Sequence, residues 1–538
     1  MQNDNDNLQY NSCISKGICS VNPRTSALQN VLGLYLHICS KYCWKLYKKN
    51  VLDSEIKHFI LNTVAISVAN PEFTETCFME VIARFKKILP ILIETYNNTF
   101  DKEDFRGEDI LASDIFKKSE NIVEAIKFGE RLLKNNVSII PNTIRNIFKI
   151  MFSIAKSISI NLMDLESYTY NGNSLQNCNT DKNAFSLLLK MLTSMSSQNT
   201  DIKKLKRLVY LGAQCNTKLM ELLHNEQEKR YGEQNIVNVS YTTTPSKAVL
   251  AVGSNIRELE TIIEALKETD IDIYTHDEMM VAHTFPKFSN YRKLKGQYGH
   301  GLENCLIDFA TFPGPIILTK HSLHNIENFY RGRLFTTDTN FYNGVIKIEN
   351  NNFEEVIKSA NQAKGFKKGK ICETVRIGYD YNECKKIISD KLNSDKYKKI
   401  VVIGLKDYSS KQKEYFENLV RLIADDILII SFSYAFDREN LLYFNTCFDS
   451  YAVVRIVSFL QDKNLPLDIF LPKCGKNTIT EMIHFSKFEH NTIYIGECEP
   501  IMINPSIINT LKEVFNIKTI ESVKTDSKEI NKLSKDLN

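Results

Sequence analysis

The residues of this chain that could do chemistry are cysteines, histidines and carboxylates gathered in a few short motifs. Cys13 and Cys19 lie near the start of the chain in the segment Cys-Ile-Ser-Lys-Gly-Ile-Cys. Far downstream, His276 and Glu278 share the run Thr-His-Asp-Glu-Met, and Cys447 lies in Asn-Thr-Cys-Phe-Asp-Ser-Tyr. Thiolates, imidazoles and carboxylates are the side chains that bind transition metals. These motifs are therefore the candidates for a metal site.

The thirteen cysteines do not follow the pattern of a disulfide-stapled protein. Their number is odd and their spacing is irregular, whereas disulfide frameworks use even numbers of cysteines in short secreted chains. The first nine residues are polar and acidic, unlike a signal peptide. No apolar run approaches the roughly 18 residues that span a bilayer. We therefore expect a cytoplasmic protein with mostly reduced cysteines and no membrane partner.

Size and composition indicate a globular protein of several domains. A chain of 538 residues is too long for one hydrophobic core, so three or four domains are expected. Its 43% apolar and 25% charged residues are typical of soluble proteins. The 68 basic and 64 acidic residues leave a net charge of +4, which gives no case for a nucleic-acid partner.

The first 230 residues are predicted to form a helical-bundle domain. From about Ser26 to Lys49, apolar residues recur at three- and four-residue steps, which predicts an amphipathic helix of about six turns. Cys39 and Cys43 are four residues apart on this helix and share one face. They could be thiolate ligands or small apolar residues of the bundle core, and we favour the core. Similar helical stretches follow at 53–69, 74–96, 120–134, 142–162, 183–196 and 202–226.

The character of the sequence changes near Ile236, where short apolar strands begin to alternate with helices. This pattern predicts two doubly wound, Rossmann-like α/β domains with parallel sheets, whose sites lie at the carboxyl ends of the strands. The fold class is thus multidomain α + α/β, with the bundle at 1–230, α/β domains at 231–370 and 371–525, and a polar tail at 526–538. Strands are expected at 249–252, 271–274, 315–319, 344–348, 375–378, 399–404, 427–432, 467–470 and 493–496.

Several ordered motifs of the first α/β region carry a family resemblance. They are Gly253-Ser254-Asn255-Ile256, Thr275-His276-Asp277-Glu278-Met279, Ala282-His283-Thr284-Phe285-Pro286, Gly296-Gln297-Tyr298-Gly299 and Arg333-Leu334-Phe335-Thr336-Thr337. With Phe-Pro-Gly-Pro-Ile at 312–316 and the Cys447 motif, they resemble the hybrid-cluster (prismane, hydroxylamine reductase) protein family, distant relatives of carbon monoxide dehydrogenases. The resemblance spans nearly the whole chain, and the family has the same order of helical and α/β domains.

The resemblance implies a cubane iron–sulfur cluster near the N-terminus, but only part of its ligand set is present. In the family, Cys-x-x-Cys followed by Cys-x5-Cys binds the cluster, because each iron takes one protein ligand. Cys13 and Cys19 match the second pair, and residues 1–12 contain no first pair. If a cubane is bound, Cys13 and Cys19 would hold it, with Cys39 and Cys43 completing the set. A standard cubane is not expected.

The resemblance also implies a hybrid iron–sulfur–oxygen cluster, held in the family by one histidine, two glutamates and four cysteines. Two positions match, Glu278 and Cys447. The other positions are occupied by Ser254, Ser322, Lys406, Phe432 or Ser433, and Gly475. Serine, lysine and glycine do not replace thiolate or imidazole as cluster ligands. An intact hybrid cluster is therefore not expected. Without iron, we predict that the Lys406 ammonium pairs with the Glu278 carboxylate.

One alternative metal site uses residues beside the lost ligands. His321 and Cys474 each lie one residue from a lost ligand position. With Glu278 and Cys447 they would suit a single zinc or iron, although a one-residue offset on a strand points a side chain to the opposite face.

Two other motifs favour structural interpretations. The run from Cys474 to Thr478 ends like a phosphate-binding loop, but Phe470 stands where that loop needs glycine, so we expect a strand-to-helix turn. His276 and His283 could be acid–base groups, but we interpret them as hydrogen-bonded structural residues.

We interpret the chain as a degenerate, non-catalytic member of the family, kept as a binding or assembly module. Its candidate partners are a second copy or an intact relative. The alternative is an iron–sulfur oxidoreductase that reduces hydroxylamine or nitric oxide with an altered cluster, supported by Cys13, Cys19, Glu278 and Cys447.

Overall fold

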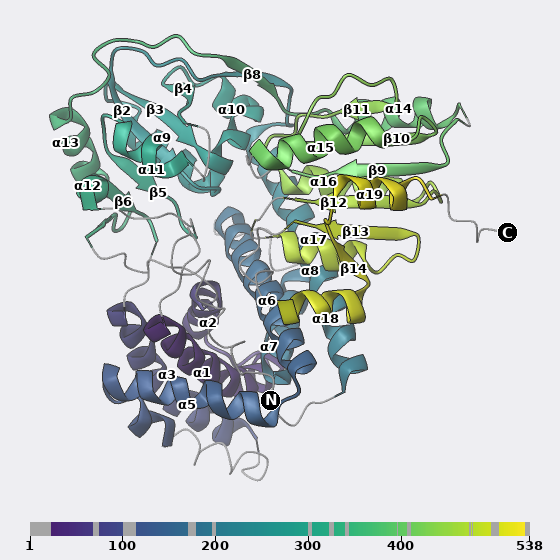
Figure 1. The fold of residues 1–538 in the computed structure, drawn as a ribbon. Coiled ribbons are helices and arrows are strands. Elements are labelled where there is room, and N and C mark those ends of the chain that lie inside the picture. Colours follow the sequence, from purple (N-terminus) through teal and green to yellow (C-terminus); the bar gives the residue numbers. More distant parts are fainter. Residues whose placement is uncertain are drawn as a thin grey trace. The chain divides into compact units, whose positions relative to one another are not determined.

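A computed structural model provides the structure of the chain (Figure 1). It describes residues 23–67, 75–100, 114–169, 179–195, 201–299, 304–321, 328–338, 344–394, 396–405, 410–472, 475, 477–496 and 505–532. The chain divides into two compact units, one formed mainly by residues up to Leu219 and one formed by most of the chain from Met220. None of the described helices is long and apolar enough to cross a membrane.

The first unit is helical throughout its described residues, as predicted. Its helix α1 packs against α3, α5 and α7, and most apolar residues of α1, including Leu28, Tyr35 and Leu46, are fully buried. The helices are α1 (Pro23–Lys48), α2 (Ser54–Ile66), α3 (Glu75–Thr99), α5 (Ile122–Ile139), α6 (Asn142–Thr169), α7 (Asn179–Ser194) and α8 (Ile202–Tyr231), the last of which continues into the second unit from Met220.

The second unit contains a first parallel sheet with strand order β4-β3-β2-β5-β6-β7. The first strand in sequence, β2, has β3 on one side and β5 on the other, so the chain crosses from one half of the sheet to the other after β4. The switch point of this doubly wound sheet therefore lies between β2 and β5. The elements are β2 (Lys247–Val252), α9 (Ile256–Leu266), β3 (Ile271–His276), the 3-10 helix η5 (Asp277–Thr284), α10 (Pro286–Ser289), β4 (Leu294–Gln297), α11 (Cys305–Thr311), β5 (Ile316–Leu318), α12 (Asn328–Arg331), β6 (Leu334–Thr336), β7 (Ile346–Lys347) and α13 (Glu354–Gln362).

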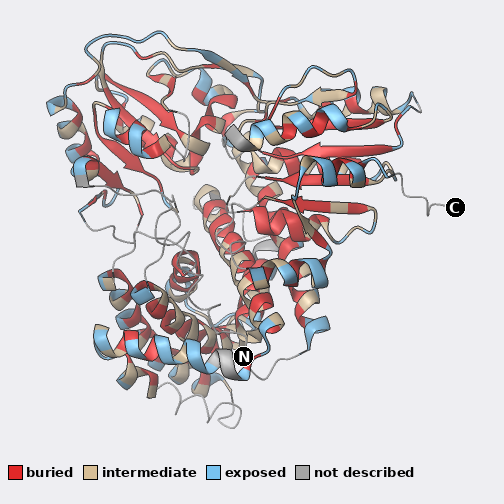
Figure 2. Ribbon diagram, in the orientation of Figure 1, coloured by how far each residue is buried: buried red, intermediate tan, exposed pale blue. Residues whose placement is uncertain are grey.

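A second parallel sheet repeats the same topology, with order β11-β10-β9-β12-β13-β14 and its switch point between β9 and β12. The predicted pair of doubly wound sheets is confirmed. The central strands of both sheets are buried along their lengths, while the covering helices expose one face (Figure 2). The elements are α14 (Tyr381–Leu392), β9 (Lys399–Ile403), α15 (Ser410–Leu422), β10 (Ile427–Ser431), β11 (Leu441–Tyr443), α16 (Ser450–Gln461), β12 (Leu467–Leu471), α17 (Thr478–Phe485), β13 (Asn491–Ile495), α18 (Pro505–Phe515), β14 (Ile517–Thr519) and α19 (Val523–Ile530).

The strand expected at 375–378 does not open the second parallel sheet. This strand, β8 (Thr374–Ile377), pairs antiparallel with β1 (Val237–Ser240) in a separate two-stranded sheet. Strands of a covered parallel sheet are apolar on both faces. In β8 only Ile377 is buried, and Thr374 and Arg376 are exposed, so the strand fits a ribbon with one covered face.

Helix α19 includes the first residues of the segment predicted as a polar tail at 526–538. Ser522 caps the helix by accepting a hydrogen bond from the Thr525 N–H at 3.2 Å. Ile530 is fully buried in a core cluster of the second sheet, and the Tyr415 hydroxyl donates to the buried Asp526 carboxylate. Asp526 and Ile530 are four residues apart and so lie on one helix face. This spacing indicates a helix, but the Lys-, Ser- and Asp-rich composition favoured a polar tail instead. The domain boundaries near 230 and 370 stay predictions.

Candidate functional site

The positions singled out in the first α/β region lie at the carboxyl ends of parallel strands. Ser254 follows β2, Glu278 follows β3 and His321 follows β5. Doubly wound sheets bind their ligands at this edge, next to the switch point. The motifs therefore lie where the topology expects a site.

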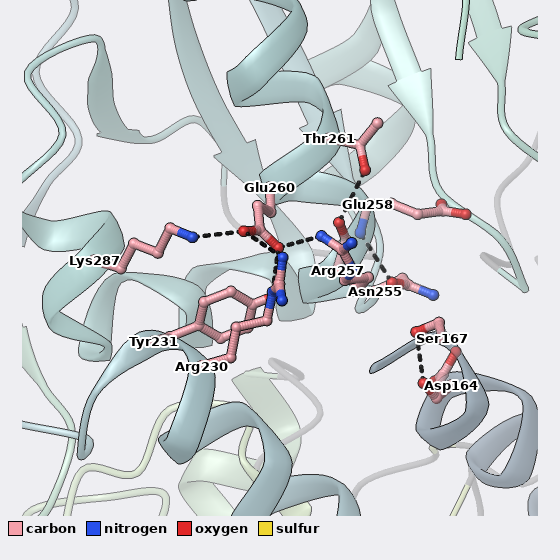
Figure 3. Close-up of polar contacts among 10 residues, drawn as sticks. All are labelled: Asp164, Ser167, Arg230, Tyr231, Asn255, Arg257, Glu258, Glu260, Thr261 and Lys287. Atoms are coloured by element: carbon pink, nitrogen blue, oxygen red, sulfur yellow. Dashed lines mark hydrogen bonds and ion pairs between the residues drawn. The ribbon is translucent and has the colours of Figure 1, made fainter. Parts of the chain in front are cut away.

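Protein groups close the switch point between β2 and β5. Asn255 caps α9 by accepting from the Glu258 N–H at 3.1 Å, and the Glu258 carboxylate turns toward the ends of the neighbouring strands (Figure 3). This carboxylate accepts from the Lys320 backbone N–H at 2.9 Å, pairs with the Lys320 Nζ at 3.3 Å and accepts from the Thr337 hydroxyl. A free helix N-terminus attracts anions, but an anion at this one would meet the negative charge of Glu258.

Glu260, two residues further along α9, is the centre of a second polar network (Figure 3). Its carboxylate accepts from Arg230 at 2.7 and 3.0 Å, from the Tyr231 hydroxyl at 3.0 Å and from the Lys287 Nζ at 2.5 Å, and it also pairs with Arg257. Burial opposes the charge, but the hydrogen bonds from Arg230 and Lys287 outweigh it and lower the pKa of Glu260 to about 2. The network fixes the end of α8 and the start of α10 to α9.

Glu278 lies half-buried in the turn η5, which a buried network holds in place. Asp277 has a left-handed backbone with φ +59°, and its N–H donates to the Gln297 side-chain oxygen at 3.0 Å. The Gln297 nitrogen donates to the Thr275 hydroxyl at 2.6 Å, and this hydroxyl lies 2.9 Å from Nε2 of His283. Burial lowers the pKa of His283 to about 4, so its imidazole is neutral at pH 7. His283 thus supports the turn that carries Glu278.

His276 forms a buried pair with a carboxylate. Its Nε2 lies 3.0 Å from Oδ2 of Asp308, and its other ring nitrogen, Nδ1, has no hydrogen-bond partner among the described residues. Gly299 has a left-handed φ of +78°, and a Cβ there would lie 2.2 Å from Oδ2 of Asp308. Glycine at this position is therefore what lets the carboxylate approach the backbone. The sequence motifs contain His276 and Gly299 but gave no sign of Asp308, because the contact joins separate elements.

Cys447 follows β11 in a left-handed conformation with φ +59°, and its N–H donates to the Asn445 side chain at 3.3 Å. Its side chain is half-buried and packs against an apolar cluster that includes Met280 and Phe448. Met280 also accepts a hydrogen bond from the Tyr241 hydroxyl through its sulfur at 3.6 Å. The structure therefore brings Cys447 to the turn that carries Glu278, among apolar side chains.

The substituted positions of the second sheet are used in packing and hydrogen bonding. The Phe432 ring is buried beside Phe444, and the Ser433 hydroxyl donates to the Gly404 carbonyl at the end of β9. Gly475 lies between β12 and α17, and its N–H donates to the Thr478 hydroxyl at 3.0 Å. This confirms the predicted strand-to-helix turn.

No group of three or more histidine, cysteine, aspartate or glutamate side chains placed to hold a metal ion occurs among the described residues. Glu278, His321 and Cys447 are therefore not gathered into such a group, and Cys474, the fourth ligand of the alternative single-metal site, lies outside the described residues, so that site stays a prediction. His321 has a left-handed φ of +61°, and its N–H donates to Asp338 at 3.0 Å. The described residues thus contain no preformed group of three metal-ligating side chains.

The predicted N-terminal ligands lie partly outside the described residues. This holds for Cys13 and Cys19, and also for Ser322, Lys406 and Cys474 downstream. Cys39 and Cys43 are fully buried in α1, and burial raises the pKa of both thiols. These two side chains therefore pack as neutral thiols, as a core interpretation requires.

A family model, the Prismane/CO dehydrogenase family, matches residues 9–528. The chain belongs to this family, and the resemblance seen in its motifs is confirmed. It is similar to proteins named hydroxylamine reductase. The one from Methanocella arvoryzae is 24% identical over 540 residues, covering 96% of this chain and 97% of that protein. Those from Thermodesulfovibrio yellowstonii and Acidiphilium cryptum are each 23% identical, covering 97% and 95% of this chain and 98% and 94% of those proteins. Within the family this chain is a divergent hydroxylamine reductase-like (hybrid-cluster) protein.

Proposed function

We propose that this protein is a non-catalytic member of its family that acts as a binding or assembly module. One observation carries the proposal: the carboxyl ends of the parallel strands, where the family resemblance predicts metal ligands, hold side chains that do not bind iron. Ser254, Gly475 and either Phe432 or Ser433 occupy three of these positions, and no metal-binding group of three residues occurs in the described chain.

The local contacts support the proposal, because the side chains at these strand ends have structural partners of their own. Ser433 bridges the ends of β10 and β9, and Glu258 closes the first switch point through Lys320 and Thr337. Cys447 packs against apolar side chains. The hybrid cluster takes seven protein ligands in the family. In this chain two of those ligand positions match, and a cluster would have to displace the contacts described above.

The N-terminal segment belongs to the same proposal. Cys39 and Cys43, which would complete the ligand set with Cys13 and Cys19 if a cubane is bound, are fully buried in α1, and this supports a chain without a standard cubane. A partial iron–sulfur site on Cys13 and Cys19 stays a prediction, as does an ion pair between Lys406 and Glu278. We further propose a cytoplasmic location, with a second copy or an intact relative as partner.

The alternative function is reduction of hydroxylamine or nitric oxide with an altered iron–sulfur cluster. Its support comes from the similar proteins named hydroxylamine reductase and from the retained ligand-type residues Glu278 and Cys447.

Anaerobic purification followed by iron and sulfide analysis and a reduced-dye assay with hydroxylamine distinguishes the two functions. We expect less than one hybrid cluster per chain and no turnover. Robust turnover that Cys447→Ala abolishes, while Cys215→Ala preserves it, would establish the oxidoreductase instead. Cys215 is a suitable control because it is a free, half-buried cysteine on α8, outside the predicted ligand set.

A further inference from the structure

A lysine-rich strip joins α13 to β8. Residues 364–371, called the lysine strip below, read Lys-Gly-Phe-Lys-Lys-Gly-Lys-Ile. The strip has four exposed lysines, Lys364, Lys367, Lys368 and Lys370, and it ends in Ile371, which is 93% exposed. No other large apolar side chain of the described residues is as exposed as Ile371.

The main chain of the strip is fixed, although its four lysine side chains are exposed. It forms two antiparallel bridges with the segment before β2, one between Phe366 and Ser246 and one between Lys370 and Thr243. The four N–H to carbonyl distances of these bridges lie between 2.8 and 3.2 Å. The Phe366 ring packs edge-on against Tyr274, with the ring centroids 5.4 Å apart.

Both glycines of the strip serve this close pairing. A Cβ on Gly365, which has φ +64°, would lie 2.5 Å from the Ser246 carbonyl oxygen. A Cβ on Gly369 would lie 2.7 Å from the Thr243 carbonyl oxygen. The main chain that carries the lysines is therefore ordered in the folded protein. Its conformational entropy is already lost on folding and is not lost again when a partner binds.

The positive charge of the strip is not neutralised locally. Neither the strip nor the paired segment 241–247 contains an aspartate or glutamate. No ion pair to Lys364, Lys367, Lys368 or Lys370 is formed by the residues that the structure describes. The main chain bends at Lys367 and Lys368, so the four lysines lie along a short bent segment of seven residues. Like charges close together on such a segment repel each other, and salt screens this repulsion beyond a Debye length of about 8 Å at physiological salt.

We propose that the lysine strip is a docking surface for an acidic protein. In this complex a row of carboxylates pairs with the four ammonium groups, and an apolar side chain of the partner covers Ile371. The ion pairs accelerate association and make it salt-dependent, and the apolar contact slows dissociation. A strip of this size matches the small interfaces of transient complexes. The proposal does not depend on whether the chain binds a cluster.

Other classes of partner fit the strip less well. It has no arginine, asparagine or glutamine, and its one aromatic ring, Phe366, packs inward, so apart from lysine it lacks the side chains that read bases or stack on them. Stable peripheral membrane binding combines a basic cluster with several buried apolar side chains or a lipid anchor, and the strip offers one exposed isoleucine on a bent segment.

Fluorescence anisotropy of the full chain with two labelled peptides tests the proposal. One peptide has a leucine between two runs of glutamates, and the other has serine in place of that leucine. The fourfold variant with glutamine at 364, 367, 368 and 370 is compared with a control that carries glutamine at Lys203, Lys204, Lys206 and Arg207 on α8. Both variants lose the same formal charge.

We expect the strip variant to weaken binding about tenfold or more and the α8 control less than about twofold. Raising the salt from about 25 to about 250 mM should weaken wild-type binding by a similar factor. Ile371→Ser should weaken binding of the leucine peptide and leave the serine peptide unchanged, which isolates the apolar contact.

Equal weakening by the strip variant and the α8 control would show a mere net-charge effect and would overturn the proposal. Tighter binding of the wild type to phosphatidylserine vesicles or to duplex DNA than to either peptide, lost in the strip variant, would also overturn it. Retained folding of each variant is checked by its urea unfolding midpoint.

Discussion

Replacing His283 by glutamine should make the second unit less sensitive to mild acid. His283 is buried at 6% exposure and forms a hydrogen bond with the Thr275 hydroxyl through Nε2, and burial favours its neutral form. Burial lowers its pKa from 6.5 to about 4. Between these two pH values, His283 is therefore protonated in the unfolded chain and neutral in the folded chain. The stability that His283 contributes is complete above about pH 6.5 and is lost as the pH falls toward 4.

The size of this effect follows from the shift. A depression from 6.5 to about 4 at 1.36 kcal/mol per pKa unit gives about 3 kcal/mol of unfolding free energy lost between pH 7 and pH 4. His283→Gln keeps a side-chain group that can accept from Thr275 but cannot bind a proton in this range. The variant should be somewhat less stable than the wild type at pH 7, and the difference should narrow toward pH 4.5.

Urea unfolding followed by near-ultraviolet circular dichroism at several pH values measures the two slopes. His484→Gln serves as a second probe, because burial also lowers the pKa of His484 to about 4 in the other sheet, and the two effects should add. Histidine-selective NMR reads the titration directly. A His283 resonance that titrates with a midpoint near 6.5, or equal pH slopes for wild type and variant, would refute the reasoning.

Three further perturbations test other contacts. Gly299→Ala should destabilise the second unit by about 1–3 kcal/mol, because it combines a left-handed backbone with a clash against Asp308. Gly332→Ala should be nearly neutral, because nothing lies within 4 Å of a Cβ at that position. Thermal unfolding compares the two variants, and equal melting temperatures would contradict the assignment. Glu260→Gln should lower the melting temperature at pH 7 and have less effect as the pH falls from 4.5 through about 2. The ion pairs that depress the pKa of Glu260 stabilise the fold only while its carboxylate is ionised. A difference in melting temperature that does not change with pH would contradict this prediction. Truncation after Glu521 should expose the core site of Ile530 and increase proteolysis of the second sheet, whereas truncation after Lys532 should not; equal digestion rates would show that α19 is dispensable.

The sequence was most informative where apolar periodicity and chain order determine structure. Short apolar strands separated by helices are enough to predict parallel, doubly wound sheets, and the buried runs at Ala248–Val252 and Lys399–Ile403 are found as central strands. β8 was assigned to the wrong sheet because a four-residue strand carries no signal for its partner. The partner, β1, lies more than 130 residues away in sequence.

The candidate site was only partly predictable for a related reason. Short motifs located Glu278, His283 and Cys447, and the structure places the segments of Glu278 and Cys447 together through Met280. The groups that hold these residues, such as Asp308 and the Glu258 carboxylate, come from separate elements. Nothing in the local sequence around an aspartate on a helix reveals that it will pair with a histidine at the end of a distant strand.

The position of the substituted residues has a consequence for how such a protein can diverge. Ser254 and Gly475 lie in the loops after β2 and β12, whereas the apolar residues that stabilise the sheets lie within the strands. Replacing a loop side chain removes a potential ligand without opening a cavity in the core. Selection on folding and selection on chemistry therefore act on different residues of this architecture. When selection on chemistry is relaxed, the loop residues can change while selection on folding still keeps the apolar residues of the strands. Such a protein can lose its ligands and keep a stable fold.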